Sequence, residues 1–284
     1  MKANNPIDSE AILDRQNRIT GCWKSGLKRV IKKRFSVFGV GGSGTNICLG
    51  LARIGVKKVY LIDNDIIEES NLTRQILFSL KDVGKKKVKV AVNSLKEHSF
   101  QTEWIPYDFD IIRKREKTID IIKKSDFVFS VVDSGGLQHF ISSVCRKYSK
   151  PMVTGGTCSN GSISIIRFQH PYKRPCNSCY TYEPFYAPKQ WLDYYAFPQK
   201  LSRYIKIVKD YDQKIKANKM ASTFITASIG SNLMLADMIN YYSGRKVPTM
   251  MMINLITNIL YTYFPDPRPN CQICSSNKKK EVLI

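Results

Sequence analysis

The segment FSVFGVGGSG at Phe35–Gly44 carries the clearest signal of the fold, because an apolar run passes there directly into a series of glycines. The residues that follow read as a helix that ends at Gly55. A second apolar run, KVYLI at Lys58–Ile62, then ends on Asp63. Strand, glycine-rich turn, helix and strand make a βαβ unit, whose two strands lie parallel. The sequence therefore predicts an α/β protein built on a parallel sheet.

The alternation of strands and helices continues along the chain. After residue 168 it gives way to a segment rich in Tyr, Phe and Pro, then to a mostly apolar helix and two strands. We therefore predict a Rossmann-like, mixed but mainly parallel sheet with helices on both faces. Further helices are expected at Lys85–His98, Gln138–Tyr148 and Thr223–Tyr241, and further strands at Glu103–Pro106, Ser125–Val132, Pro151–Thr154, Ser162–Phe168, Thr249–Asn254 and Asn258–Phe264.

The basic composition attracts anions but narrows the choice of partner little. With 45 Lys and Arg against 23 Asp and Glu, the formal net charge is +22, and a field of that size attracts nucleotides, acidic proteins and nucleic acids. No nucleic-acid-binding module accompanies the basic residues, so a solvated surface is favoured and nucleic acid is not the expected partner. The basic runs are Lys28–Arg34, Lys81–Lys89, Arg113–Lys117 and Lys278–Lys280.

The sequence shows no targeting or membrane segment. Asn4, Asp8 and Glu10 occupy the place where a secretory signal would have its apolar region. No apolar run approaches the roughly 18 residues that a membrane span needs. We therefore expect a soluble, cytoplasmic protein with reduced thiols and no membrane partner.

The glycines of the first turn suit a phosphate group. Gly39, Gly41, Gly42 and Gly44 lie between a strand and a helix, so backbone amides can face a phosphate without a Cβ in the way. Asp63 stands at about the position where a dinucleotide site would have its ribose-binding acid. At this point an NAD-dependent oxidoreductase remains possible.

Three later motifs narrow the choice of nucleotide. They are LIDNDIIEESNLTRQ, which contains Asp63 to Arg74, VGKKK at Val83–Lys87, and VVDS at Val131–Ser134. Together with the glycine loop they resemble the ThiF/MoeB/HesA family of the ubiquitin-activating superfamily, over Arg15 to Cys274. The resemblance implies an ATP site in which Asp63 binds the ribose, Gly42 and Asn71 line the nucleotide, and Arg74 and Lys87 hold the phosphates. Asp133 would hold Mg²⁺. The full implied set is Gly39, Gly41, Gly42, Gly44, Asp63, Asp65, Asn71, Arg74, Lys87 and Asp133.

Each of the implied charged residues also has a purely structural interpretation. Arg74 could form a surface salt bridge, and Lys87 could belong to a solvated helix face with the lysines around it. Asp133 could cap the helix that follows Gly136. Near the N-terminus, Arg15–Arg18 resembles the family's RYNRQ segment, with Gln16 in place of the usual Tyr. By that resemblance Arg18 would reach the ATP of a partner subunit, which makes a homodimer the expected assembly.

The eight cysteines include two Cys-x-x-Cys pairs. Cys176 with Cys179, and Cys271 with Cys274, can together form a tetrahedral thiolate site for Zn²⁺. The family has this arrangement; redox pairs are the alternative. The stretch between the pairs holds no cysteine, so thioester transfer is doubtful. Aromatic residues of the expected crossover loop could clamp an extended peptide tail: Tyr182, Phe185, Tyr186, Trp191, Tyr194 and Tyr195.

The resemblance implies an ATP-dependent adenylyltransferase that uses Mg²⁺ and activates the C-terminal carboxylate of a small ubiquitin-like sulfur-carrier protein. Adenylation of a short ribosomal peptide is the alternative, since NLTRQILFS and DVGKKK look like the microcin-maturing branch. A catalytically silent scaffold and an NAD-dependent oxidoreductase are the other hypotheses. Within one compact domain we expect an N-terminal helical arm (1–34), a Rossmann-like ATP-binding part (35–168), and a part with the crossover loop and zinc site (169–284).

Overall fold

The computed structural model describes residues 8–158, 161–179, 221–264, 266–267, 271 and 273–274. The aromatic residues Tyr182 to Tyr195 of the expected crossover loop lie outside these residues. Among the helices of the described part, none is long and apolar enough to cross a membrane.

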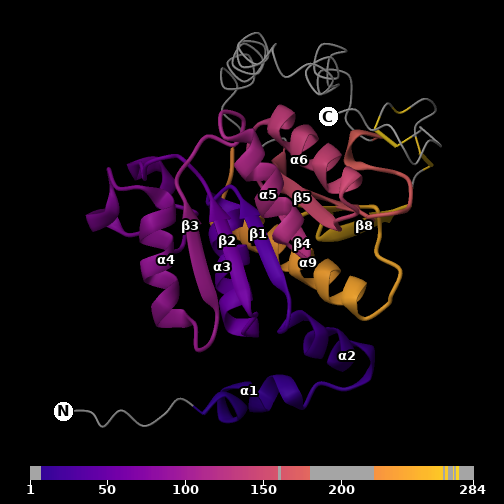
Figure 1. Ribbon diagram of the computed structural model, residues 1–284, viewed down its shortest axis with the longest axis horizontal. Coiled ribbons are helices and arrows are strands. Elements are labelled where there is room, and N and C mark those ends of the chain that lie inside the picture. The colour runs from indigo at the N-terminus through magenta and orange to yellow at the C-terminus, as the bar shows by residue number, and fades with distance from the viewer. Residues whose placement is uncertain are drawn as a thin grey trace.

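A single mixed sheet of eight strands forms the centre of the molecule (Figure 1). Its order is β3-β2-β1-β4-β5-β6-β7-β8. Neighbours from β3 to β5 are parallel, and β5 to β8 pair antiparallel. The predicted mixed, mainly parallel sheet is therefore confirmed. The strands are β1 Arg34–Phe38, β2 Lys58–Ile62, β3 Glu103–Tyr107, β4 Phe127–Ser130, β5 Met152–Cys158, β6 Ile163–Gln169, β7 Met250–Asn254 and β8 Ile259–Tyr263.

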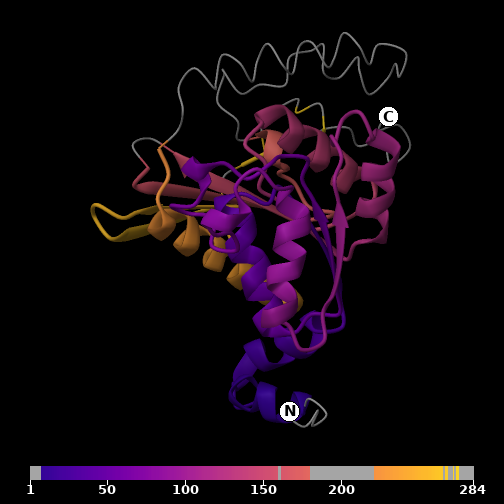
Figure 2. The same cartoon turned by 90° about the vertical axis from the view of Figure 1, so that its left-hand side faces the viewer.

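Helices cover both faces of this sheet, as the two views in Figures 1 and 2 show. One buried cluster joins the sheet to side chains of α3, α4 and α9, and the other joins it to α5 and α6. The described α-helices are α1 Ser9–Asn17, α2 Gly21–Val30, α3 Gly42–Ile54, α4 Lys87–His98, α5 Arg115–Lys124, α6 Gly135–Lys147 and α9 Phe224–Tyr242. Short 3-10 turns are η1 Glu69–Asn71, η2 Leu80–Asp82 and η3 Asn177–Cys179.

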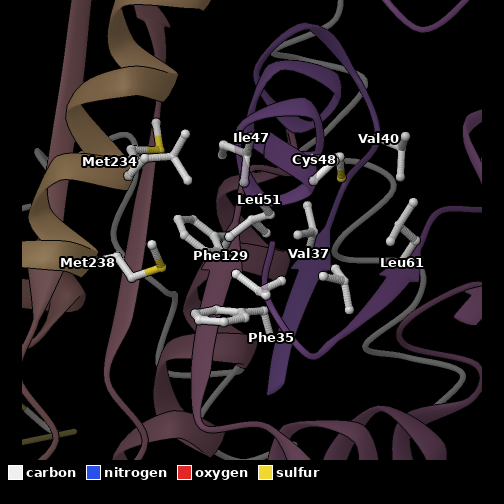
Figure 3. Close-up of a cluster of buried hydrophobic side chains, with 14 of the residues drawn as sticks. Phe35, Val37, Val40, Ile47, Cys48, Leu51, Leu61, Phe129, Met234 and Met238 are labelled. Carbon is white, nitrogen blue, oxygen red and sulfur yellow. The ribbon is translucent and has the colours of Figure 1, made fainter. Parts of the chain in front are cut away.

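The two-residue period of β1 assigns its side chains to the two faces. Phe35 and Val37 enter the cluster that contains α3 and α9, whereas Phe38 enters the opposite one. Figure 3 shows the first cluster, in which Met234 and Met238 of α9 approach the same strands. Burial of these large apolar side chains removes them from water and stabilises the layers by about 1.5–3 kcal/mol each.

Helix α5 is an element that the sequence pattern did not reveal. Its first residues were interpreted only as the basic run Arg113–Lys117, yet the helix continues to Lys124. Thr118, Ile121 and Ile122 are its buried residues, at the spacing of one helical face. A narrow apolar stripe on a charged helix gives a weak signal, and packing on the sheet decides the structure.

The first two helices lie together at one end of the molecule, at the bottom of Figure 1. Helix α1 has no buried residue, whereas α2 buries Gly26, Leu27 and Val30. The side chain of Trp23 donates a hydrogen bond to Asn240 of α9 at 2.8 Å. Helix α2 is therefore fixed to the body of the protein.

Candidate nucleotide site and cysteine cluster

The glycine loop lies at the carboxyl end of β1 and leads into α3. Gly39 has φ +92, and a Cβ there would lie 2.7 Å from the carbonyl oxygen of Val131. A Cβ on Gly44 would collide with the carbonyl oxygen of Gly39. Gly41 is the N-cap of α3 and supplies no side-chain cap. The amides of the first turn are thus left available for an anionic group.

The carboxylate of Asp63 is held beside this loop by the backbone. Its Oδ2 accepts a hydrogen bond from the amide of Val40 at 2.7 Å, and its Oδ1 accepts one from the amide of Asp65 at 2.8 Å. Burial raises the pKa of Asp63, while Lys87 and the two amides act in the opposite direction. A half-buried carboxylate with fixed orientation can accept a hydroxyl donor such as a ribose.

Lys87 is buried at the start of α4, unlike the exposed Lys85 and Lys89 that flank it. Its ammonium pairs with Asp65 at 2.9 Å, and its side chain is only 9% exposed against 64% for Asp65. The solvated-face interpretation of Lys87 is therefore wrong. A cation held in this way against Asp65, and close enough to oppose the effect of burial on the pKa of Asp63, can balance negative charge beside that carboxylate.

Arg74 lies over the glycine loop. A Cβ on Gly42 would meet the Cγ of Arg74 at 3.2 Å, so the glycine makes room for this side chain. The guanidinium donates a hydrogen bond to the carbonyl oxygen of Ser70 at 2.8 Å. Among the described residues Arg74 forms no ion pair, which contradicts the salt-bridge interpretation. Its charge remains available at the loop.

Asn71 and Gln75 occupy the buried side of the same segment. The Oδ1 of Asn71 accepts a hydrogen bond from the amide of Glu68 at 3.1 Å, which gives Asn71 a structural task. Gln75 is 3% exposed, and its Oε1 has no partner among the described residues. The Nε2 of Gln75 lies 3.9 Å from where a Cβ on Gly41 would be. Sequence reasoning did not place Gln75 in the site, although it follows Arg74 directly in the Asn-x-x-Arg-Gln motif.

Asp133 follows β4, next to the glycine loop. The backbone of the preceding Val131 lies against Gly39, and Asp133 itself is exposed. The N-cap of α6 is Ser134, whose hydroxyl accepts a hydrogen bond from the amide of Leu137 at 3.3 Å. The helix-cap interpretation of Asp133 is therefore wrong, and its carboxylate is free of that task.

The structure does not bring Arg18 to this site within one chain. Arg18 forms an exposed ion pair with Asp14 at 2.9 Å. The neighbouring Gln16 donates a hydrogen bond to the carbonyl oxygen of Ile54 at 3.2 Å, at the C-terminal end of α3. The glycine loop is at the other end of that helix, which is about 18 Å long at a rise of about 1.5 Å per residue.

The four predicted metal ligands form one cluster. The Sγ atoms of Cys176, Cys179, Cys271 and Cys274 all lie within 4.8 Å of one another. The Cys176–Cys271 and Cys179–Cys274 pairs are 3.6 and 3.4 Å apart, too far for disulfides. A tetrahedral site with Zn–S bonds of about 2.3 Å places sulfurs about 3.8 Å apart. The cluster can hold such an ion, with every position filled by sulfur.

Helix α6 and strand β6 hold the first cysteine pair in place. Gln169 is fully buried, and its Oε1 accepts hydrogen bonds from the hydroxyl of Ser142 at 2.6 Å and the amide of Asn177 at 3.0 Å. Arg146, one turn along α6 from Ser142, donates to the carbonyl oxygens of His170 and Lys173 at 3.2 and 2.8 Å. The loop that carries Cys176 is therefore tied to the body of the protein.

Comparison with known proteins relates this geometry to a family. A family model described as the ThiF family matches residues 13–275. The SUMO-activating enzyme subunit uba-2 of Caenorhabditis elegans is 28% identical over 145 residues, which are 51% of this chain and 25% of that protein. Adenylyltransferase and sulfurtransferase UBA4 of Scheffersomyces stipitis is 30% identical over 162 residues, which are 56% of this chain and 36% of UBA4. The chain spans well under half the length of these relatives.

A similar fold is found among solved structures. The structure of Escherichia coli MccB with MccA-N7isoASN superposes with a TM-score of 0.70 and 21% identity. The match covers 88% of this chain and 69% of MccB. This likeness shows that the two proteins share a fold.

Proposed function

Because the chain belongs to the ThiF family, we propose that it is an ATP-dependent adenylyltransferase that activates the C-terminal carboxylate of a small ubiquitin-like sulfur-carrier protein. One observation carries the proposal. Arg74 lies against Gly42 of the glycine loop, Asp63 is fixed beside the loop by the amide of Val40, and the buried Lys87 pairs with Asp65, two residues beyond Asp63. UBA4, one of the relatives, is an adenylyltransferase and sulfurtransferase by name.

The proposed reaction needs no nucleophilic side chain. An oxygen of the acceptor's carboxylate attacks the α-phosphorus of ATP, a new O–P bond forms, and the bond to pyrophosphate breaks. The protein orients the nucleotide through Asp63 and the loop amides, and stabilises the charge that moves to pyrophosphate through Arg74 and Lys87. Asp133 would hold Mg²⁺, which would neutralise charge on the phosphate oxygens.

The remote position of Arg18 supports a role in a partner's site. Arg18 follows Gln16, which contacts the C-terminal end of α3, and the glycine loop lies at the opposite end of that helix, about 18 Å along its axis. A second copy of the chain can present the arginine instead. We therefore infer a homodimer in which Arg18 of each chain contacts the phosphates bound by the other. The exposed Asp14–Arg18 ion pair costs little to break, since pairs of this kind contribute about 0–1 kcal/mol.

Zinc in the cysteine cluster has a structural role in this proposal. Four thiolates close the coordination sphere, so no position is left for a substrate. Four free thiols also suit a reducing compartment such as the cytoplasm.

The peptide alternative concerns the acceptor and leaves the chemistry unchanged. The fold shared with MccB and the NLTRQILFS and DVGKKK stretches favour it as the second candidate. A carrier protein and a short peptide can be compared directly as acceptors in one assay. An NAD-dependent oxidoreductase explains neither Lys87 nor the four cysteines, and NAD is therefore the nucleotide control.

Pyrophosphate exchange into ATP tests the roles of the site residues, because adenylate formation is reversible while the product stays bound. Asp133→Ala and Arg74→Ala should each lower the exchange rate about a hundredfold or more, as loss of one charge-stabilising group does. Lys89→Ala, on the exposed face of α4, is the matched control and should keep the rate. Normal exchange in both site variants, with an acceptor that supports the wild type, would refute the assignment.

Mixing of inactive subunits tests the proposed homodimer. Arg18→Ala and Asp133→Ala chains should each be inactive, but a mixed dimer carries one site with both residues intact. Restored exchange after subunit mixing is expected. No rescue in a sample with demonstrated subunit exchange would remove Arg18 from the site and leave the adenylation proposal standing.

A further inference from the structure

Half of the net charge of +22 lies in a short part of the chain. Residues 15–62 contain eleven Lys and Arg and no Asp or Glu. Such a block departs from the mixed pattern of an ordinary solvated surface, in which both signs alternate. Helix α5 shows that mixed pattern, since Glu116 and Asp120 stand among its lysines.

The fold collects these cations at the amino edge of the sheet. Helix α2 immediately precedes β1, and Lys57 immediately precedes β2. The two strands are parallel neighbours, with Arg34 paired to Lys58 in register. Arg53 lies near the same edge, in the last turn of α3. We call the exposed residues Lys24, Lys28, Arg29, Lys32, Arg53 and Lys57 the amino-edge surface.

Few of the charges in this block are neutralised. Ion pairs join Arg18 to Asp14, Arg34 to Asp126 and Lys58 to Glu103. Within the described part of the chain, the six residues of the amino-edge surface have no acidic partner. Arg29 and Arg53 bond neutral groups, namely the carbonyl oxygen of Tyr242 at 2.9 Å and the ring of His98 at 3.1 Å. Their positive charge is left for a ligand.

The amino-edge surface is separate from the proposed adenylation site. It lies at the amino ends of β1 and β2, whereas the glycine loop lies at the carboxyl end of β1. Helix α3 spans the distance, about 18 Å from its first to its last residue. Within one chain, an acceptor tail bound at the glycine loop would therefore not contact the cations of the amino-edge surface.

The amino-edge surface offers positive charge rather than a broad exposed apolar area. Among the described residues, none of the exposed large hydrophobic side chains falls between residues 15 and 62. The apolar face of α2, with Leu27 and Val30, is buried. A membrane-binding helix must insert an apolar face, and a protein interface usually has an apolar centre. Its dense positive charge favours a polymer that offers regularly spaced negative charge.

We propose that the amino-edge surface binds the phosphodiester backbone of nucleic acid without reading its sequence. Lys24, Lys28 and Lys32 follow one another at four-residue spacing, so their ammonium groups lie about one helical turn apart along α2 and its end. Lysine and arginine contacts to phosphates release bound counterions, which supplies sequence-independent affinity. The expectation that nucleic acid is not the partner rested on the absence of a recognition module, and binding of this kind needs none.

Fluorescence anisotropy with a short labelled duplex DNA and a labelled RNA hairpin tests the proposal. The full chain should bind both, and the logarithm of the binding constant should fall linearly with the logarithm of salt concentration. Lys24→Glu/Lys28→Glu/Lys32→Glu should weaken binding at least about tenfold near 0.1 M salt and reduce the salt slope by about two to three, since each phosphate contact contributes about 0.9.

A charge-matched variant separates a local surface from the field of the whole protein. Lys114→Glu/Lys117→Glu/Lys123→Glu also reverses three exposed lysines, at α5, and has the same net charge. It should bind within a few-fold of the wild type. Equal losses in both triple variants with unchanged thermal unfolding, absence of binding by the wild type, or stronger binding to labelled polyglutamate than to both nucleic acids would each overturn the proposal.

Discussion

Asp237 should make the stability of this protein fall as the pH rises. The residue is 2% exposed in the middle of α9, and its Oδ2 has no partner among the described residues. Burial raises its pKa from an ordinary 3.8 to about 8. The folded state therefore keeps the proton over a pH range in which the unfolded state has already lost it.

The sign and size of the effect follow from this shift. Between about pH 4 and pH 8 the folded chain binds more protons than the unfolded chain, so the free energy of unfolding decreases with pH by at most about 1.4 kcal/mol per unit. From pH 5 to pH 8 the loss amounts to at most about 4 kcal/mol. The contribution levels off above pH 8, where both states are ionised. Asp237→Asn removes this dependence because an amide does not titrate.

Urea unfolding of the zinc-loaded protein at pH 5, 6, 7 and 8 measures the difference between Asp237→Asn and the wild type. That difference should grow steadily in favour of the variant, since all other groups titrate in both proteins. Asp120→Asn is the control. Lys124 holds the pKa of the exposed Asp120 low, so removing the Asp120 carboxylate cannot make the stability difference grow between pH 5 and pH 8. A constant difference for Asp237→Asn would show that this carboxylate is ionised and solvated in the folded protein.

Three further outcomes are expected. Gly42→Ala should displace the Arg74 side chain and lower pyrophosphate exchange with little change in melting temperature. Gly44→Ala should lower both the exchange rate and the melting temperature, since its Cβ meets the Gly39 carbonyl. Equal melting temperatures in the two variants would contradict the different contacts of the two glycines. The purified protein should contain about one zinc per chain by elemental analysis, and a folded, zinc-free protein would contradict the cluster's role. Gln169→Ala should speed the removal of zinc by a chelator about 10–100-fold. Thr118→Ala, which also loses a buried side-chain hydrogen bond, is the control and should not change this rate. Equal rates in the two variants would exclude Gln169 as a positioning residue.

The sequence predicted the elements whose signal is local. Runs of Phe, Val, Ile and Tyr with adjacent glycines gave β1, β2 and the start of α3 to within a few residues, because buried parallel strands are apolar throughout. The two cysteine pairs, some 95 residues apart in the chain, were placed together by family resemblance, and the structure confirms that they meet.

Other features depend on tertiary packing and have no local signal. The burial of Lys87 among exposed lysines arises because α4 begins against Asp65, which spacing alone does not show. Gln75, Gln169 and Asp237 are polar side chains in buried positions, and a pattern of apolar residues cannot identify them. Helix α5 was missed for the same reason, since most of its residues are charged.

Transfer of AMP to an acceptor is the direct test of carboxylate adenylation. The protein is incubated with ATP, Mg²⁺ and either a ubiquitin-like carrier or a short peptide, and the intact mass of the acceptor is measured beside that of the same acceptor with an amidated C-terminus. The acceptor with a free carboxylate should gain one AMP group, the amidated acceptor should gain none, and NAD should not replace ATP. AMP on the amidated acceptor, or on no acceptor of either class, would contradict carboxylate adenylation.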